Sequence, residues 1–283
     1  MLSDVQLFNL VLVKEIDAIC QKYGIEYYLA GGSVIGVLRH KGFIPWDDDM
    51  DLYMTRDNWL KFREAFDKEQ PEDRILESSD INPNYPNMIA KYTSTNTTAI
   101  YKNLLSGNYA AGVIVDILIL DPVPSDPAIQ QQHLKNLLLY SEFVNRYYVF
   151  SHRFDIDVDF DAALEREAQI GHEALVREYE KLVTQYSEEE SDTYVLRWGG
   201  VPHTFAKDLF ATPKWMPFEG IMLPVPQKAF MYLAQLYGED WIQLPPLEEE
   251  RVHDAVFSID RPYSEFFKEF DPHFDEQAYL EAI

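Results

Sequence analysis

The first part of the chain alternates between helical and extended apolar patterns. After Ser3, which can cap a helix, apolar residues return every three or four positions until Gly24. A short apolar run, Tyr27 to Ala30, then leads into Gly31-Gly32-Ser33, and Val34 to His40 has the pattern of one or two helical turns. This order predicts a helix, a buried strand, a tight turn and a short helix.

Strands and helices remain interleaved up to about residue 120. Alternating positions from Asp49 to Met54 predict a strand, and Thr55 or Asp57 can cap a following helix that Pro71 ends. Two later runs predict a hairpin around Ser94 to Asn96, and a third predicts a long strand. The three runs are Met88 to Tyr92, Thr98 to Tyr101 and Val113 to Leu120.

Helical patterns dominate the second half of the chain. Apolar residues recur at helical spacing from Pro127 to about Tyr186, with a second, more charged helix after Ala162. An extended piece around Phe218 to Val225 precedes a helix from Gln227 to Tyr237, which Gly238 closes. The later half therefore predicts helices added to the core that comes before it.

Length and composition set the size of that core. A chain of 283 residues with 47% hydrophobic content can bury one large core or two small ones. Together with the patterns, this predicts an α/β (α+β) fold, a mixed sheet core flanked by helices with additional C-terminal helical elements. Residues 1–125 would form the catalytic core, and residues 126–283 would complete the same domain.

Charge and cysteine content restrict the partners and the compartment. The net charge is −24, whereas nucleic-acid backbones and anionic lipids require clustered basic residues. We therefore expect no nucleic-acid partner and at most peripheral membrane contact, and an anionic ligand must be held by a metal ion or backbone amides. The single cysteine, Cys20, excludes an internal disulfide. Without a signal peptide or a long apolar segment, the chain is expected to be cytoplasmic.

Four carboxylates crowd into the stretch Asp47-Asp48-Asp49-Met50-Asp51. Alternate residues of a strand share a face, so Asp49 and Asp51 are expected to point the same way, where they repel unless a cation lies between them. Carboxylate oxygens of this kind select Mg²⁺ or Mn²⁺, with phosphate oxygens as further ligands. Asp47 and Asp48 would tune the site or remain solvated. A charged turn without any metal is the alternative interpretation.

Two further features strengthen the metal hypothesis. Gly31-Gly32-Ser33 follows a strand and opens a helix, where backbone amides can bind a phosphate, although a plain tight turn has the same pattern. It is not a Walker A loop, because Val37-Leu38 replaces Lys-Ser/Thr. Asp116 interrupts a strongly apolar strand, where an ionised carboxylate is costly unless it is paired or binds a metal. Together these features are typical of a nucleotidyltransferase fold.

One sequence motif is more specific than this general fold pattern. The segment from Leu29 to Asp51 resembles the signature of the LicD family, and the resemblance extends over residues 16–253, weakest in the helical middle. Further similar pieces are Gly112 to Ile117 with Leu120-Asp121, Phe218-Glu219-Gly220 leading to Pro224-Val225-Pro226, and Tyr237-Gly238 followed by Pro245-Pro246. In one place the chain departs from the family, which usually has Phe-Pro where Leu118-Ile119 stands here.

The resemblance implies a metal-dependent phosphotransferase that moves phosphocholine from CDP-choline to a sugar hydroxyl of a teichoic acid, lipopolysaccharide or other cell-surface glycan precursor. It implies that Asp49, Asp51 and Asp116 are catalytic residues that bind Mg²⁺ or Mn²⁺, with Asp116 also a candidate general base. Gly31, Gly32 and Ser33 would contact the donor phosphate. The partners would be a nucleotide-activated donor such as CDP-choline and a glycan acceptor.

Several residues near these motifs are further candidates. Lys91 and Arg39 are the basic side chains that could bind phosphate oxygens, although residues of these types more often lie on the surface. Trp46 could face a quaternary ammonium, or pack against the acidic loop. Glu219 and His253 fall in family-like segments without a role that we can assign.

Two other functions stay open from the sequence. One is a generic nucleotidyltransferase that transfers a nucleoside monophosphate to a protein or a small molecule. The other is a catalytically inactive relative that serves as a binding subunit, which would show no metal-dependent change.

Overall fold

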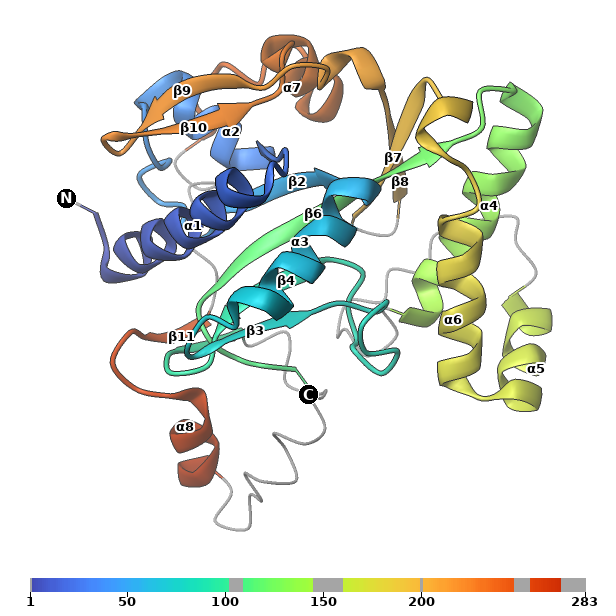
Figure 1. Cartoon of the computed structure of the whole chain (residues 1–283), viewed down its shortest axis with the longest axis horizontal. Helices are drawn as coiled ribbons and strands as arrows, with labels where there is room; N and C mark the ends of the chain where they lie inside the picture. The colour runs from blue at the N-terminus through green and yellow to red at the C-terminus, as the bar shows by residue number, and fades with distance from the viewer. Residues whose placement is uncertain (1, 102–108, 145–159, 199–200, 247–254, 271–283) are drawn as a thin grey trace.

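A computed structural model describes residues 2–101, 109–144, 160–198, 201–246 and 255–270. A curled mixed sheet forms the centre and helices lie on its faces (Figure 1), which confirms the predicted α/β fold. Within the described residues, the main sheet follows the order β1 (Tyr28–Leu29), β2 (Asp51–Thr55), β6 (Ile114–Val123), β4 (Ala90–Ser94) and β3 (Arg74–Glu77). Strand β7 (Thr193–Trp198) pairs with β6, and β8 (Val201–Ala206) pairs with β7.

Strand β6 is the centre of the sheet. Its residues 116–120 pair with β2 in parallel, its residues 114–117 pair with β4 antiparallel, and its residues 120–123 pair with β7. The pair of β6 with β7 is antiparallel, as are the remaining pairs of this sheet. The apolar run that predicted a strand here thus supplies the element to which three others bond.

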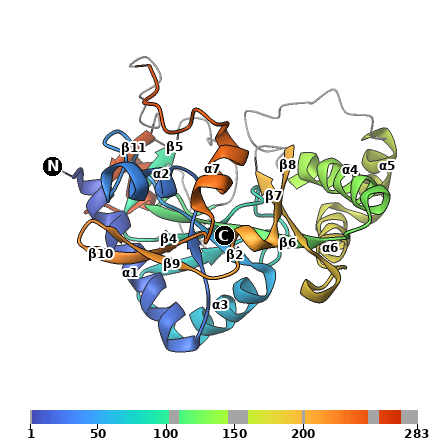
Figure 2. The ribbon, with the colours of Figure 1, turned by 90° about the horizontal axis from the view of Figure 1, so that it is seen from above.

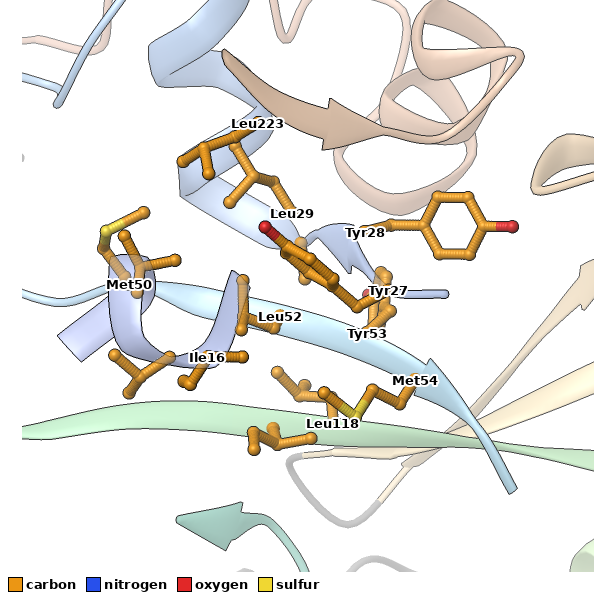
Figure 3. Packing of buried hydrophobic residues seen from close by; sticks show 14 of the residues in the cluster. Ile16, Tyr27, Tyr28, Leu29, Met50, Leu52, Tyr53, Met54, Leu118 and Leu223 are labelled. Carbon is orange, nitrogen blue, oxygen red and sulfur yellow. The ribbon is translucent and has the colours of Figure 1, made fainter. Parts of the chain in front are cut away.

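Helices α1 (Asp4–Tyr23) and α3 (Arg56–Glu69) cover one face of the sheet. The first begins at a capping box of Ser3 and Gln6 and ends at Gly24, whose φ of 66° suits glycine, so the predicted helix is confirmed. On this face Ile16 of α1 lies near Met50 and Leu52 (Figure 3). All three side chains are fully buried.

The opposite face carries aromatic residues and the second half of the chain. Tyr53 points away from Leu52 and packs edge to face on Phe210 and Tyr232. Around it lie three elements of this face: α2 (Gly31–His40), α7 (Ala229–Tyr237) and the hairpin of β9 (Lys214–Phe218) and β10 (Ile221–Val225). Residues after 126 therefore supply part of the central sheet and much of this face.

Three further helices gather at one end of the sheet, away from α1 and α2 (Figure 2). They are α4 (Pro127–Val144), α5 (Phe160–Ile170) and α6 (His172–Val183). The remaining elements are β5 (Thr98–Tyr101), β11 (Ala255–Ser258), α8 (Tyr263–Phe270) and the short 3-10 turns Glu188–Glu190 and Lys207–Leu209. No helix among the described residues is long and apolar enough to cross a bilayer.

Two details of the predicted strands are wrong. The expected hairpin does not form, because both edges of β4 are taken by β3 and β6, and β5 pairs instead with β11. The strand expected from Asp49 begins at Asp51. Before it, the carbonyl groups of Asp47 and Asp48 accept hydrogen bonds from side chains of α1 rather than from a neighbouring strand.

A buried ion pair fixes α3 to the central strand. Arg56 Nε lies 2.6 Å from Asp121 Oδ1, and both side chains are almost inaccessible to water. Arg56 also lies 3.7 Å from Asp80 and 4.0 Å from Glu180 of α6. Removal of one partner would leave an uncompensated charge in the interior, which is far more costly than the loss of an exposed pair.

We therefore expect Asp121→Ala to lower the free energy of unfolding by about 3 kcal/mol in a urea titration. The control is Lys22→Ala, which removes a surface ion pair with Glu69 and should leave the denaturation midpoint almost unchanged. Equal midpoints for the two variants would contradict a stabilising role for the buried pair.

Candidate active site

Four ionisable residues occupy consecutive register positions across the sheet. Asp51 of β2 pairs with Asp116 of β6, Asp116 with Lys91 of β4, and Lys91 with Glu77 of β3. Cross-strand partners point to the same face of a sheet, so these side chains form one row. The row lies on the face of Tyr53, opposite α1 and α3.

Lys91 compensates the charge of Asp116. Its Nζ lies 2.5 Å from Asp116 Oδ1, and Lys91 is only 7% exposed. A carboxylate within an apolar sheet needs such a partner. Lys91 is thus at the predicted site, but its ammonium is already paired with a carboxylate.

Asp51 is surrounded by other carboxylates. Burial raises its pKa above the usual range, and the nearby carboxylates of Asp49, Asp116 and Asp47 raise it further, while Lys91 lowers it. A bound cation would reverse this effect, because it stabilises the ionised form. The arrangement is therefore electrostatically unfavourable without positive charge.

The loop Asp47-Asp48-Asp49, here called the acidic loop, brings three more carboxylates together. One oxygen from each of Asp47, Asp48 and Asp49 lies within 4.8 Å of the others. Asp47 and Asp48 are therefore as close to a common centre as Asp49, and Asp48 is buried. These oxygen donors fit a hard divalent cation, because Mg²⁺ and Mn²⁺ prefer carboxylates.

Two polar side chains of α1 hold this loop. Gln6 Nε2 donates to the carbonyl of Asp47 at 2.7 Å, and Asn9 Nδ2 donates to the carbonyl of Asp48 at 2.8 Å. Both side chains are buried on a helix that is otherwise apolar on that side. The N-terminal helix thus fixes the backbone from which the carboxylates project.

Glu219 holds the segment that precedes the acidic loop. Its Oε1 accepts from the amide of Phe43 at 3.3 Å, and its own amide donates to the carbonyl of Lys41. A Cβ atom at Gly42 would lie 1.8 Å from that Oε1, so glycine leaves room for the carboxylate. This contact gives Glu219 a structural role, whereas His253 lies outside the described residues.

The turn at the start of α2 meets the carboxylates. Gly31 has a φ of 49°, and a Cβ there would lie 3.0 Å from Asp51 Oδ2. A Cβ at Gly32 would lie 2.9 Å from Asp47 Oδ2, and Ser33 Oγ accepts from the amide of Asp51 at 3.1 Å. The structure therefore brings all three predicted turn residues to the acidic site.

Arg39 is not brought there. It lies near the other end of α2, about 12 Å along the helix axis from Gly31 at 1.5 Å per residue. Its guanidinium donates to the carbonyl of Gln243 at 3.1 Å. Trp46, half-buried, packs against the main hydrophobic core.

The departure from the family pattern leaves the strand intact. Leu118 and Ile119 continue β6 and pair with Tyr53 and Met54 of β2. The residues after Asp116 therefore remain extended beside the site.

Sequence reasoning missed three residues at the site. Glu77 ends the row. Burial raises the pKa of Tyr101, and the carboxylates of Asp49 and Asp116 raise it further, so Tyr101 belongs to the surroundings of the site. Tyr237 reaches the site from α7, and its pKa is raised by burial, then by Tyr232 and Asp51. Only Tyr237 had a signal in the sequence, because it lies in a family-like segment.

Glu77 provides a test of the charged row through pH. It accepts from the amide of Ala110 at 2.9 Å, and burial raises its pKa from 4.5 to about 7. The folded protein therefore holds this proton more tightly than the unfolded chain, and the free energy of unfolding should fall as pH rises through this interval, by about 3 kcal/mol. Glu77→Gln should remove most of this fall in urea titrations across the interval.

The matched control is Glu72→Gln, at an exposed position. It should keep the slope of the unmodified protein. A Glu77→Gln variant with an unchanged slope would show that Glu77 is already ionised in the folded state.

Comparison with known proteins places these residues in a family context. Residues 24–106 match the family model described as "LicD/FKTN/FKRP, nucleotidyltransferase domain". The match contains the turn at the start of α2, the acidic loop and Lys91, and it ends before Asp116.

A similarity to one curated protein extends over nearly the whole chain. The lipopolysaccharide cholinephosphotransferase LicD of Haemophilus influenzae is 29% identical over 261 residues, which cover 89% of this chain and 95% of that protein. An uncharacterised protein of Rickettsia typhi is 32% identical over 53 residues, 19% of this chain and 17% of that protein. The first similarity therefore includes both the central sheet and the second half of the chain.

Proposed function

We propose that this chain acts as a member of the LicD family and moves phosphocholine from CDP-choline to a sugar hydroxyl of a cell-surface glycan precursor such as lipopolysaccharide. The relative from Haemophilus influenzae is named as a cholinephosphotransferase of lipopolysaccharide, which makes this chain an enzyme of the class that transfers phosphorus-containing groups. A cytoplasmic location and a peripheral contact with a membrane-bound acceptor remain predictions.

One observation carries the proposal. Asp51 and Asp116 stand side by side on parallel strands, and the acidic loop and the start of α2 meet at the same place. Oxygen-bound cations and backbone amides in this combination can bind a nucleotide diphosphate.

We propose that Asp49, Asp51 and Asp116 hold Mg²⁺ or Mn²⁺. Asp47 and Asp48, each with a carboxylate oxygen within 4.8 Å of one of Asp49, are further candidate ligands. A bound cation would neutralise charge on the donor diphosphate during transfer. The five carboxylates have hard oxygen donors, which suits these ions and not a zinc site built from cysteine.

The remaining groups position the reactants. The amides of Gly32 and Ser33 lie at the start of α2, where the helix dipole favours a phosphate. Because Ser33 Oγ accepts from Asp51, its own proton is available for a phosphate oxygen. The sugar oxygen would bond to the phosphorus that bears choline, and the bond from that phosphorus to CMP would break. Asp116 would take the proton of the hydroxyl or complete the metal shell.

The test is CMP release from CDP-choline by the purified chain with Mg²⁺ or Mn²⁺ and a lipopolysaccharide acceptor. We expect metal-dependent release that Asp51→Asn lowers by about 100-fold or more, because even indirect support of a metal ligand is worth 10- to 100-fold. Asp67→Asn, an exposed carboxylate on α3, is the control and should retain full activity.

Other outcomes would redirect the proposal. Release from CDP-ribitol or CDP-glycerol in place of CDP-choline would keep the reaction and change the donor. Transfer of a nucleoside monophosphate would favour the generic nucleotidyltransferase, and the lack of any metal-dependent change would favour an inactive binding relative.

A further inference from the structure

Tyr237 brings a phenol from the second half of the chain to the acidic site. It is the last residue of α7, which Gly238 ends with a φ of 92°. A Cβ at Gly31 would lie 3.2 Å from Tyr237 Oη and 3.0 Å from Asp51 Oδ2. The hydroxyl therefore lies beside the first residue of α2, next to a carboxylate of the row.

Helix α7 is fixed in this position by a neighbouring tyrosine. The amide of Gly31 donates to Tyr232 Oη at 2.8 Å, and Tyr232 in turn donates to Tyr53 Oη at 3.1 Å. Tyr232 is fully buried, whereas Tyr237 is 40% exposed. The buried contact thus holds the helix, and the side chain of Tyr237 faces both the site and solvent.

Among the described residues, the hydroxyl of Tyr237 is a donor without an acceptor. Within the part of the chain that the structure describes, no residue accepts a hydrogen bond from it. Its charged neighbours are Asp51, Asp47 and Asp49, whose carboxylates the proposed function assigns to a cation. A phosphate at the start of α2 would bring an oxygen to this donor, and hydrogen bonds to charged acceptors are the strong ones.

We propose that Tyr237 is a substrate-binding residue that donates a hydrogen bond to a phosphate oxygen of the nucleotide diphosphate donor. This inference rests on the proposed function for the identity of that donor. It adds a contact from α7 to those of Gly32 and Ser33, so that the phosphate is held between the two halves of the chain. Gly31 keeps the space between the hydroxyl and Asp51 open.

The test replaces only the hydroxyl. Tyr237→Phe keeps the ring, and we expect it to weaken binding of pyrophosphate in the presence of Mn²⁺ by about tenfold in calorimetry. Binding of Mn²⁺ alone and the urea midpoint should stay as in the unmodified protein. Tyr23→Phe is the control, because that hydroxyl bonds to Glu69 at the far end of α1.

Kinetics give a second readout. With CDP-choline, Tyr237→Phe should raise KM or lower kcat by about tenfold, whereas Tyr23→Phe should change neither. If the unmodified protein releases no CMP but the variant still loses affinity for pyrophosphate, the proposed donor is wrong and the role of Tyr237 stands.

Three results would overturn the inference. The first is pyrophosphate affinity within twofold of the unmodified protein. The second is weaker binding of Mn²⁺ alone, which would mean that Tyr237 acts through the carboxylates. The third is the absence of pyrophosphate binding by the unmodified protein with Mn²⁺, since no phosphate would then occupy the start of α2.

Discussion

Mutual repulsion among carboxylates on one sheet face is the constraint around which this molecule is arranged. Asp51 and Asp116 are neighbours by strand register, and three further carboxylates lie in the adjoining loop. Lys91 offsets part of this charge from within the sheet. The loop itself is fixed through its backbone, because Gln6 and Asn9 of α1 donate hydrogen bonds to its carbonyl groups. The carboxylates of the loop are therefore held near one another despite their repulsion.

The sequence predicted the centre of the site better than its surroundings. Asp116 could be recognised because a charge within an apolar run needs a reason, and the turn at Gly31 could be recognised because glycine and serine follow a strand. The sequence predicted that Asp51 and Asp116 act in one site, and the structure adds that they are direct partners across the parallel strands β2 and β6. The shared face that we expected for Asp49 and Asp51 assumed a strand that begins at Asp49. The strand β2 begins two residues later, at Asp51.

What could not be predicted depends on contacts between distant segments. An apolar run indicates a strand but not its neighbour, so β5 was placed beside β4 instead of β11. Gln6 and Asn9 look like ordinary polar positions of a helix until the loop that they hold is in place. Glu77 and Tyr101 carry no local pattern, and Arg39 was misjudged because the length of α2 separates it from Gly31.

The hydrogen bond from Gly31 to Tyr232 joins residues 201 positions apart. A ribosome therefore completes the glycine turn, the acidic loop and β6 long before it makes α7. Until α7 emerges, the nascent chain has the carboxylates of the acidic loop and of β2 and β6 but not the helix that anchors the start of α2. The entropic cost of closing a loop rises only slowly with its length, so this hydrogen bond can form once the helix is available. The start of α2 therefore gains its anchor only after Tyr232 has been synthesised.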